Sequence, residues 1–156
     1  TRWPDLISRY TGGDHQLFRS PGVTNLGIGM NHPNLGTWNA NPTAVNPPKT
    51  KVRDLQVAKP VDTIIFADSA KMAASPSASA DPDTWKALNP QSGIWLFRTP
   101  INGCCYDNPV NNERLIGRYS GRAMTMMVDG HAEGLKPSQV GFQFPQGDAR
   151  AMWDEF

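Results

Sequence analysis

The segment from Ala123 to Leu135 constrains the fold more than any other part of the sequence. It reads AMTMMV, then Asp-Gly, then HAEGL, so two runs with strand character flank a dipeptide that favours a tight hairpin. A type I′ turn needs positive φ at both central residues, and Asp129 followed by Gly130 supplies them. The sequence therefore predicts an antiparallel hairpin with strands at 123–128 and 131–135.

Further strands are expected where β-branched and aromatic residues cluster between turn signals. VDTIIFAD at 61–68 is the clearest, and its continuous apolar centre favours a strand covered on both faces. GIWLFR at 93–98 and a short run at 27–31 are two more. RWPDLISRY at 2–10 predicts a short helix, because a proline near its start and apolar residues on one face suit a first turn.

The segments between these elements are rich in proline, glycine, asparagine and serine. Long loops are expected at 31–51, 68–92 and 99–114. Loops of this length are uncommon in a compact domain unless they have a purpose. KPSQVGF predicts one helical turn, and the tail at 148–156 is expected to pack Met152 and Trp153 onto the body.

Composition limits the classes of function. The chain of 156 residues fits one domain spanning 1–156, and its formal net charge is +1. The sequence has no run of lysine and arginine that would form a basic patch for nucleic acid, and we expect no nucleic-acid partner. No apolar run approaches the length of about 18 residues that suggests a membrane-spanning helix.

Catalytic patterns are weak, and we expect no enzyme activity and no catalytic residue. Ser120 lies in GRYSGR, which is not a Gly-x-Ser-x-Gly elbow, and no zinc-protease or phosphate-loop motif occurs. Asp129 and His131 flank a glycine at a predicted turn. Turn geometry accounts for Asp129 and Gly130 without chemistry, and a lone histidine at that place is more often a surface residue than a ligand.

Two metal sites remain open as alternatives, although no cofactor and no metal ligand is predicted. Asp68 and Asp129 each end a predicted strand, so a shared metal site is conceivable. A cluster of carboxylates and amides could also offer oxygens to Ca²⁺, without the spacing of an EF-hand loop. Its members are Asp107, Asn108, Asn111, Asn112 and Glu113.

The only cysteines, Cys104 and Cys105, are adjacent. They are either two small loop residues or a reducible vicinal disulfide, and the sequence leaves their redox state open.

The segment RYSGRAMTMMVDGHA resembles the C-terminal motif of a group of bacterial type IV pilin-like proteins and type II secretion pseudopilins. That motif is a histidine, nine residues, then Asp-Gly, often followed by histidine. Tyr119 stands where the histidine of the family belongs. LFRSPG, with Ser20 in place of the family's cysteine, and KVRDLQVAKPVDTIIFADS match two further family segments in order. The positions of the motif segment taken as structural are Arg118, Tyr119, Ser120, Gly121, Asp129, Gly130 and His131.

The resemblance implies an α+β fold, in which a short N-terminal helix packs on an antiparallel sheet with long loops. It also implies a structural subunit of a pilus-like or pseudopilus filament at the cell envelope, whose partners are other pilin or pseudopilin subunits. Members are anchored in the inner membrane before assembly and then lie in the periplasm or at the cell surface. The family's anchor is an apolar N-terminal helix absent from this sequence, which we expect to be the ectodomain that follows it.

The second interpretation is a surface-exposed binding module. The long loops contain Trp38 and Trp85, and tryptophan is enriched at contact hot spots. That role is compatible with a filament subunit.

Overall fold

The sheet is organised around its central strand, β2. The computed structural model describes residues 3–35, 56–73, 81–102, 105–108 and 110–156. Its strands are β1 (Ile28–His32), β2 (Ile64–Lys71), β3 (Leu96–Arg98), β4 (Glu113–Leu115), β5 (Ala123–Met127) and β6 (Ala132–Leu135). Its helices are α1 (Trp3–Ile7), η1 (Ser8–Tyr10), η2 (His15–Phe18), η5 (Pro82–Thr84) and α2 (Pro137–Val140).

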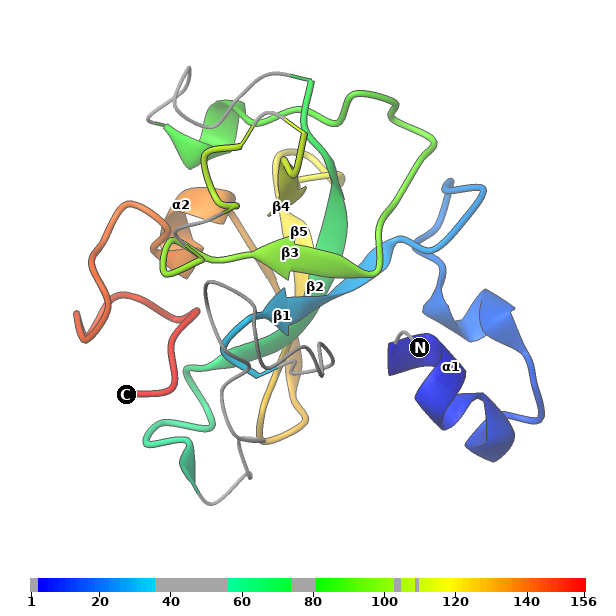
Figure 1. The fold of residues 1–156 in the computed structure, drawn as a ribbon, viewed down its shortest axis with the longest axis horizontal. Helices are drawn as coiled ribbons and strands as arrows, with labels where there is room; N and C mark the ends of the chain where they lie inside the picture. Colours follow the sequence, from blue (N-terminus) through cyan, green and yellow to red (C-terminus); the bar gives the residue numbers. More distant parts are fainter. Residues whose placement is uncertain (1–2, 36–55, 74–80, 103–104, 109) are drawn as a thin grey trace.

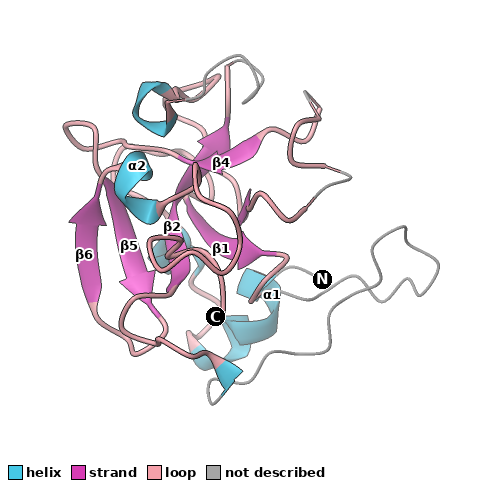
Figure 2. Cartoon of the chain, turned by 90° about the vertical axis from the view of Figure 1, so that its left-hand side faces the viewer, coloured by secondary structure: helices cyan, strands magenta, loops and turns pink. Residues whose placement is uncertain are grey.

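The six strands of the described residues form one mostly antiparallel sheet (Figure 1). Five of them follow the order β3-β1-β2-β5-β6, and β4 lies off this path and pairs with β2. β2 pairs antiparallel with β1, β5 and β4, while β1 and β3 form a parallel pair. β5 and β6 lie side by side at one edge of the sheet (Figure 2). With its short N-terminal helix, the protein has the α+β fold that the sequence predicts.

The two faces of the sheet have different surroundings. Along β5 the side chains alternate, so that Ala123, Thr125 and Met127 are buried while Met124 and Met126 are exposed. Period-two alternation of this kind means that one face contacts the core and the other lies outside it. We call these the inner and the outer face. In Figure 1, α1 and α2 flank the sheet on opposite sides.

The inner face carries the main hydrophobic core. Its large, fully buried members come from six parts of the chain: Ile64, Phe97, Leu115, Met127, Val140 and Trp153. The single turn of α2 brings Val140 into this core, as the KPSQVGF segment predicts, and Gly141 ends the helix in the left-handed conformation.

The N-terminal helix packs against part of the outer face. The Trp3 ring lies 4.7 Å from the Phe66 ring and 5.0 Å from the Phe18 ring, measured between centroids. The indole N–H of Trp3 donates a hydrogen bond of 2.6 Å to the Trp95 carbonyl. This helix is the one predicted over 2–10, and it continues directly into η1.

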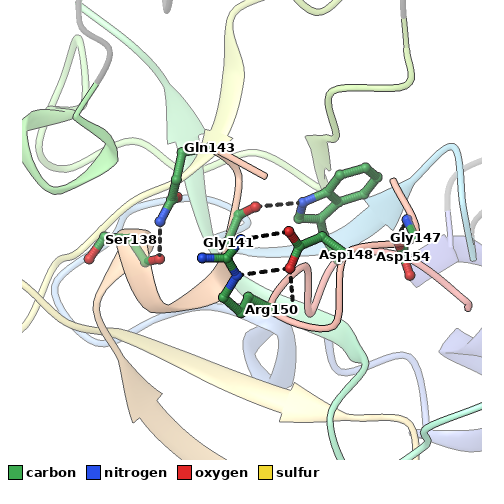
Figure 3. Close-up of polar contacts among 8 residues, drawn as sticks. Ser138, Gly141, Gln143, Gly147, Asp148, Arg150 and Asp154 are labelled. Carbon is green, nitrogen blue, oxygen red and sulfur yellow. Dashed lines mark hydrogen bonds and ion pairs between the residues drawn. The ribbon is translucent and has the colours of Figure 1, made fainter. Parts of the chain in front are cut away.

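The C-terminal segment returns to the core as expected. Trp153 is fully buried, and its indole N–H donates to the Gly141 carbonyl at 2.9 Å. The Trp153 carbonyl accepts from the side-chain amides of Asn31 and Asn34, at 2.8 and 2.7 Å. Asp154 accepts from the Gly147 N–H at 2.6 Å, within the network drawn in Figure 3. The tail is therefore fixed by both apolar packing and buried hydrogen bonds.

Several predicted boundaries differ from the structure. β2 continues three residues past Asp68, through Ser69, Ala70 and Lys71, into a segment that the sequence places in a loop. Polar residues extend this strand because its far end pairs with β4, which lies in the predicted loop at 99–114. The predicted loop at 31–51 lies largely outside the described residues.

We predict that Trp153→Ala lowers the free energy of unfolding by about 3–5 kcal/mol, because it removes a fully buried aromatic side chain and a buried hydrogen bond. Phe156→Ala, three residues away and 61% exposed, is the matched control, with an expected loss below about 0.5 kcal/mol. Urea unfolding of the three proteins measures both values. Equal losses would mean that the tail does not anchor the core.

Candidate functional site

The motif segment begins with a tight two-residue turn. The backbone N–H groups and carbonyls of Tyr119 and Arg122 bond to each other in both directions at 2.9 Å. Between them, Ser120 has φ of 50° and Gly121 has φ of 78°. Positive φ at both central residues is the signature of a type I′ turn. The turn type that the sequence predicts at Asp129-Gly130 therefore occurs nine residues earlier.

The hairpin between β5 and β6 is present, but its turn is of another kind. The Gly130 N–H bonds to the Met127 carbonyl at 3.0 Å, and the Met127 N–H bonds to the His131 carbonyl at 2.9 Å. Gly130 has φ of 98°, whereas Asp129 is not among the residues with positive φ. This is the three-residue hairpin loop with a left-handed glycine, so the type I′ prediction was wrong here. His131 closes the loop opposite Met127, and β6 begins at the next residue, Ala132.

Asp129 and His131 form a small polar cluster at this hairpin. One oxygen of Asp129 accepts from the His131 backbone N–H at 3.1 Å and lies 2.7 Å from Nδ1 of the His131 ring. These hydrogen bonds lower the pKa of the Asp129 carboxyl. The Glu133 carboxylate lies 4.0 Å from Nε2 of His131. All three side chains are more than a third exposed to solvent, so Asp129 serves the local backbone, as turn aspartates do.

The buried polar site of the motif lies elsewhere, around Asp68 in β2. One carboxylate oxygen of Asp68 accepts from the Ser20 hydroxyl, and the other accepts from the Met124 N–H at 2.8 Å. Burial raises the pKa of the Asp68 carboxyl, while the hydrogen bonds from Ser20 and Met124 and the charge of Arg118 oppose that rise. Asp68 thereby joins the segment before β1 to two strands of the sheet.

Arg118 connects further segments to the same place. Its guanidinium donates to the backbone carbonyls of Ser69, Pro90 and Ser92 at distances of 2.7 to 3.0 Å. Burial lowers the pKa of Arg118, and the negative charge of Asp68 partly compensates for it. The neighbouring Tyr119 hydroxyl donates to the Pro21 carbonyl at 3.3 Å.

The three sequence segments that resemble the pilin-like family thus meet at one point. Ser20 comes from LFRSPG, Asp68 from the segment of β2, and Arg118 and Tyr119 from RYSGR. We call these four residues the Asp68 clasp. Sequence reasoning singled out Arg118 and Tyr119 but did not place Ser20 and Asp68 beside them. A buried strand that carries an aspartate is the signal that could have indicated a paired carboxylate.

The shared metal site of Asp68 and Asp129 is not supported. Asp68 lies inside β2 and not at its end, and both of its oxygens accept hydrogen bonds from the protein. Residue 67 pairs with residue 125, whereas Asp129 lies in the hairpin loop beyond the end of β5 at Met127. Among the described parts of the chain, no group of three or more His, Cys, Asp or Glu side chains could hold a metal ion.

The proposed Ca²⁺ cluster is likewise occupied by protein contacts. Glu113 forms an ion pair of 2.7 Å with Arg98, and the Asn112 amide donates to the Met72 carbonyl at 2.5 Å. The side-chain oxygen of Asn108 accepts from the backbone N–H of Val110 at 2.8 Å. These contacts of Glu113, Asn112 and Asn108 stabilise β4 and the loop before it. Asp107 and Asn111 are the other two members of the cluster.

β4 also contains a buried arginine that the sequence did not indicate. Arg114 is fully buried, and its guanidinium donates to the carbonyls of Glu113 and Tyr106. It lies 3.9 Å above the Tyr106 ring, a cation–π contact. Burial lowers the pKa of Arg114 and raises the pKa of Tyr106. Cys105, beside Tyr106, is disulfide-bonded, and Cys104 lies outside the described residues.

Trp85 is not exposed on its loop. It is buried in the core and contacts the Phe142 ring at 5.4 Å between centroids. Trp38, the other tryptophan of the long loops, lies outside the described residues.

Comparison with protein-family models, with curated proteins and with solved structures finds no match for this chain. Within the described ranges, no helix is both long enough and apolar enough to cross a membrane.

We predict that Gly130→Ala costs about 1–3 kcal/mol of stability, since a side chain is strained at positive φ. Gly134→Ala in β6 is the control, because φ there is not in that region and an added methyl group meets nothing closer than 3.8 Å. Thermal unfolding of both variants distinguishes the two sites. Equal melting temperatures would contradict the left-handed assignment of Gly130.

We also predict that the stability difference between the parent and Asp68→Asn depends on pH. The pKa of Asp68 is raised in the folded protein, so the unfolded chain releases this proton more readily. The parent should therefore lose stability relative to the variant as the pH rises from below 4 through the folded pKa to neutrality. Denaturant unfolding across this range tests the sign. A difference that grows in favour of the parent with rising pH would contradict it.

Proposed function

We propose that this chain is a structural subunit of a type IV pilus-like or type II secretion pseudopilus filament at the cell envelope. The observation that carries the proposal is the Asp68 clasp. Ser20, Asp68, Arg118 and Tyr119 come from the three segments that resemble the pilin-like family. Ser20 is hydrogen-bonded to Asp68, the charge of Arg118 acts on Asp68, and Tyr119 donates to the carbonyl of Pro21 next to Ser20, although up to 99 positions separate these residues in the sequence. Residues that share a family pattern and one buried network are expected to serve the fold.

The chemistry of the clasp favours a structural role over a catalytic one. Both oxygens of Asp68 accept hydrogen bonds from donors within the protein, and the residue is only 3% exposed, which favours a structural role for this carboxylate. The two terminal nitrogens of Arg118 donate hydrogen bonds to backbone carbonyls, and these bonds fix the loop at Pro90 and Ser92 against β2. Tyr119, where the family has histidine, keeps a hydrogen bond to the Pro21 carbonyl without a group that titrates near neutral pH.

The hairpin at Asp129 to His131 supports the same role. Its Asp-Gly dipeptide forms a tight loop whose glycine requires positive φ, and its histidine lies at the surface. Both features serve the shape of the hairpin. The proposed partners are other pilin or pseudopilin subunits, and the proposed location is the periplasm or the cell surface, with inner-membrane anchoring before assembly through an apolar N-terminal helix.

The test begins with the gene. The proposal expects codons for about 20 apolar residues upstream of Thr1, preceded by a prepilin peptidase cleavage site. In the source cells, antibodies raised against this chain should label sheared filaments, or should detect it cross-linked to other pilin-like subunits. Deleting the upstream apolar segment should abolish that association while the melting temperature of residues 1–156 stays the same.

A gene that encodes no apolar helix upstream, together with a product that never enters a filament or cross-links to such subunits, would overturn the proposal. Arg118→Gln provides a separate control. It should destabilise the fold without changing the specificity of assembly, whereas an effect on assembly alone would assign Arg118 to an interface.

A further inference from the structure

The outer face of the sheet carries a groove that the core does not fill. Its volume is about 360 Å³, within the range of about 300–1,000 Å³ that is usual for small-molecule sites. It lies between the N-terminal helices and the outer-facing side chains of β2 and β5. The apolar side chains that line it include Trp3, Ile7, Phe18, Phe66, Met124 and Met126.

The groove exposes more apolar surface than a packed strand face normally does. Met124 is 50% exposed, Met126 is 41% exposed and Ile7 is 38% exposed. Contiguous apolar patches of this kind mark interaction sites on proteins in water. Methionine is common at surfaces that accept flexible apolar ligands, because its unbranched side chain adapts to their shape.

The floor of the groove has no unpaired strand edge to which a peptide could bind. The β2 and β5 backbones are paired with each other, and their other edges are paired with β1 and β6. A peptide laid on this floor would therefore find no backbone ladder to extend, which is the usual source of affinity for a bound strand. A ligand whose body needs no hydrogen bonds fits this surface better.

The charges around the groove favour an anionic end group. Two charged residues line it, Arg19 and Asp68. Asp68 is 3% exposed and has both oxygens bonded to donors, so it presents no free charge to a ligand. Arg19 is exposed, and it takes part in none of the ion pairs found among the described residues. The groove therefore combines an apolar lining with an exposed arginine at its rim.

We propose that this groove binds a long-chain aliphatic carboxylate, with its chain along Trp3, Phe66 and Met126 and its carboxylate paired with Arg19. Such a ligand matches both features, because the chain leaves water for an apolar surface while the charge stays at the exposed rim. Ser20, Asp68 and Tyr119 of the clasp also line the groove, but ligand binding there does not depend on the proposed filament role.

The experiment is calorimetric titration of the 156-residue protein with oleate, below the concentration at which oleate forms micelles, and with oleyl alcohol as the uncharged analogue. Oleate should bind at one site per chain and more tightly than the alcohol. Arg19→Gln should weaken oleate binding about threefold to fivefold and leave the affinity for the alcohol unchanged, as expected for an exposed ion pair.

The groove itself is tested with two variants and one control. Met126→Gln and Met124→Gln should each weaken both ligands about tenfold, because a polar amide replaces apolar contact area. Leu88→Gln also replaces an exposed apolar residue, 65% exposed and outside the groove lining, and should leave both affinities unchanged. A melting temperature measured for each variant verifies that it is folded.

Three outcomes would overturn the proposal. The first is the absence of saturable oleate binding by the parent. The second is binding that Leu88→Gln weakens as much as the methionine variants do, which indicates non-specific adsorption. The third is a parent that sediments as a dimer which Met126→Gln dissociates, because the occupant of the groove is then a second copy of the chain.

Discussion

The structure depends on one buried carboxylate and the groups that compensate for it. Asp68 lies in the central strand of the sheet, where an unpaired charge would be costly. Its two oxygens therefore require donors, and the protein supplies them from Ser20 and from the Met124 N–H. This requirement fixes the segment before β1 over the sheet. Arg118 then brings the loop at Pro90 and Ser92 to the same place.

This constraint explains why the two faces of the sheet differ. The inner face is closed by apolar residues from strands, α2 and the C-terminal tail, with Trp153 fully buried among them. The outer face is covered by Trp3 and Phe18 over only part of its area, because the clasp holds their segment at one side of β2. Met124 and Met126 remain exposed beside it, and the groove follows from that partial cover.

Sequence reasoning located most elements because their signals are local. The apolar run of β2, the hairpin around Gly130, the N-terminal helix and the buried tail each depend on neighbouring residues. The turn type at Asp129 was wrong, since Asp-Gly suits two hairpin loops and the strand register decides between them. β4 was missed because Glu113 and Arg114 are polar, and their burial depends on contacts with Arg98 and Tyr106, which lie 15 and 8 positions away in the sequence.

The clasp is likewise a long-range feature, since nothing near Ser20 in the sequence indicates a carboxylate 48 positions away. Its role in holding the fold is the central claim, and a double-mutant cycle between Ser20→Ala and Asp68→Asn measures it most directly. Denaturant unfolding of the parent, both single variants and the double variant gives the coupling free energy. A coupling of about 1–3 kcal/mol, the range for contacting residues of one network, is the predicted result. Additive losses, with a coupling near zero, would contradict the account.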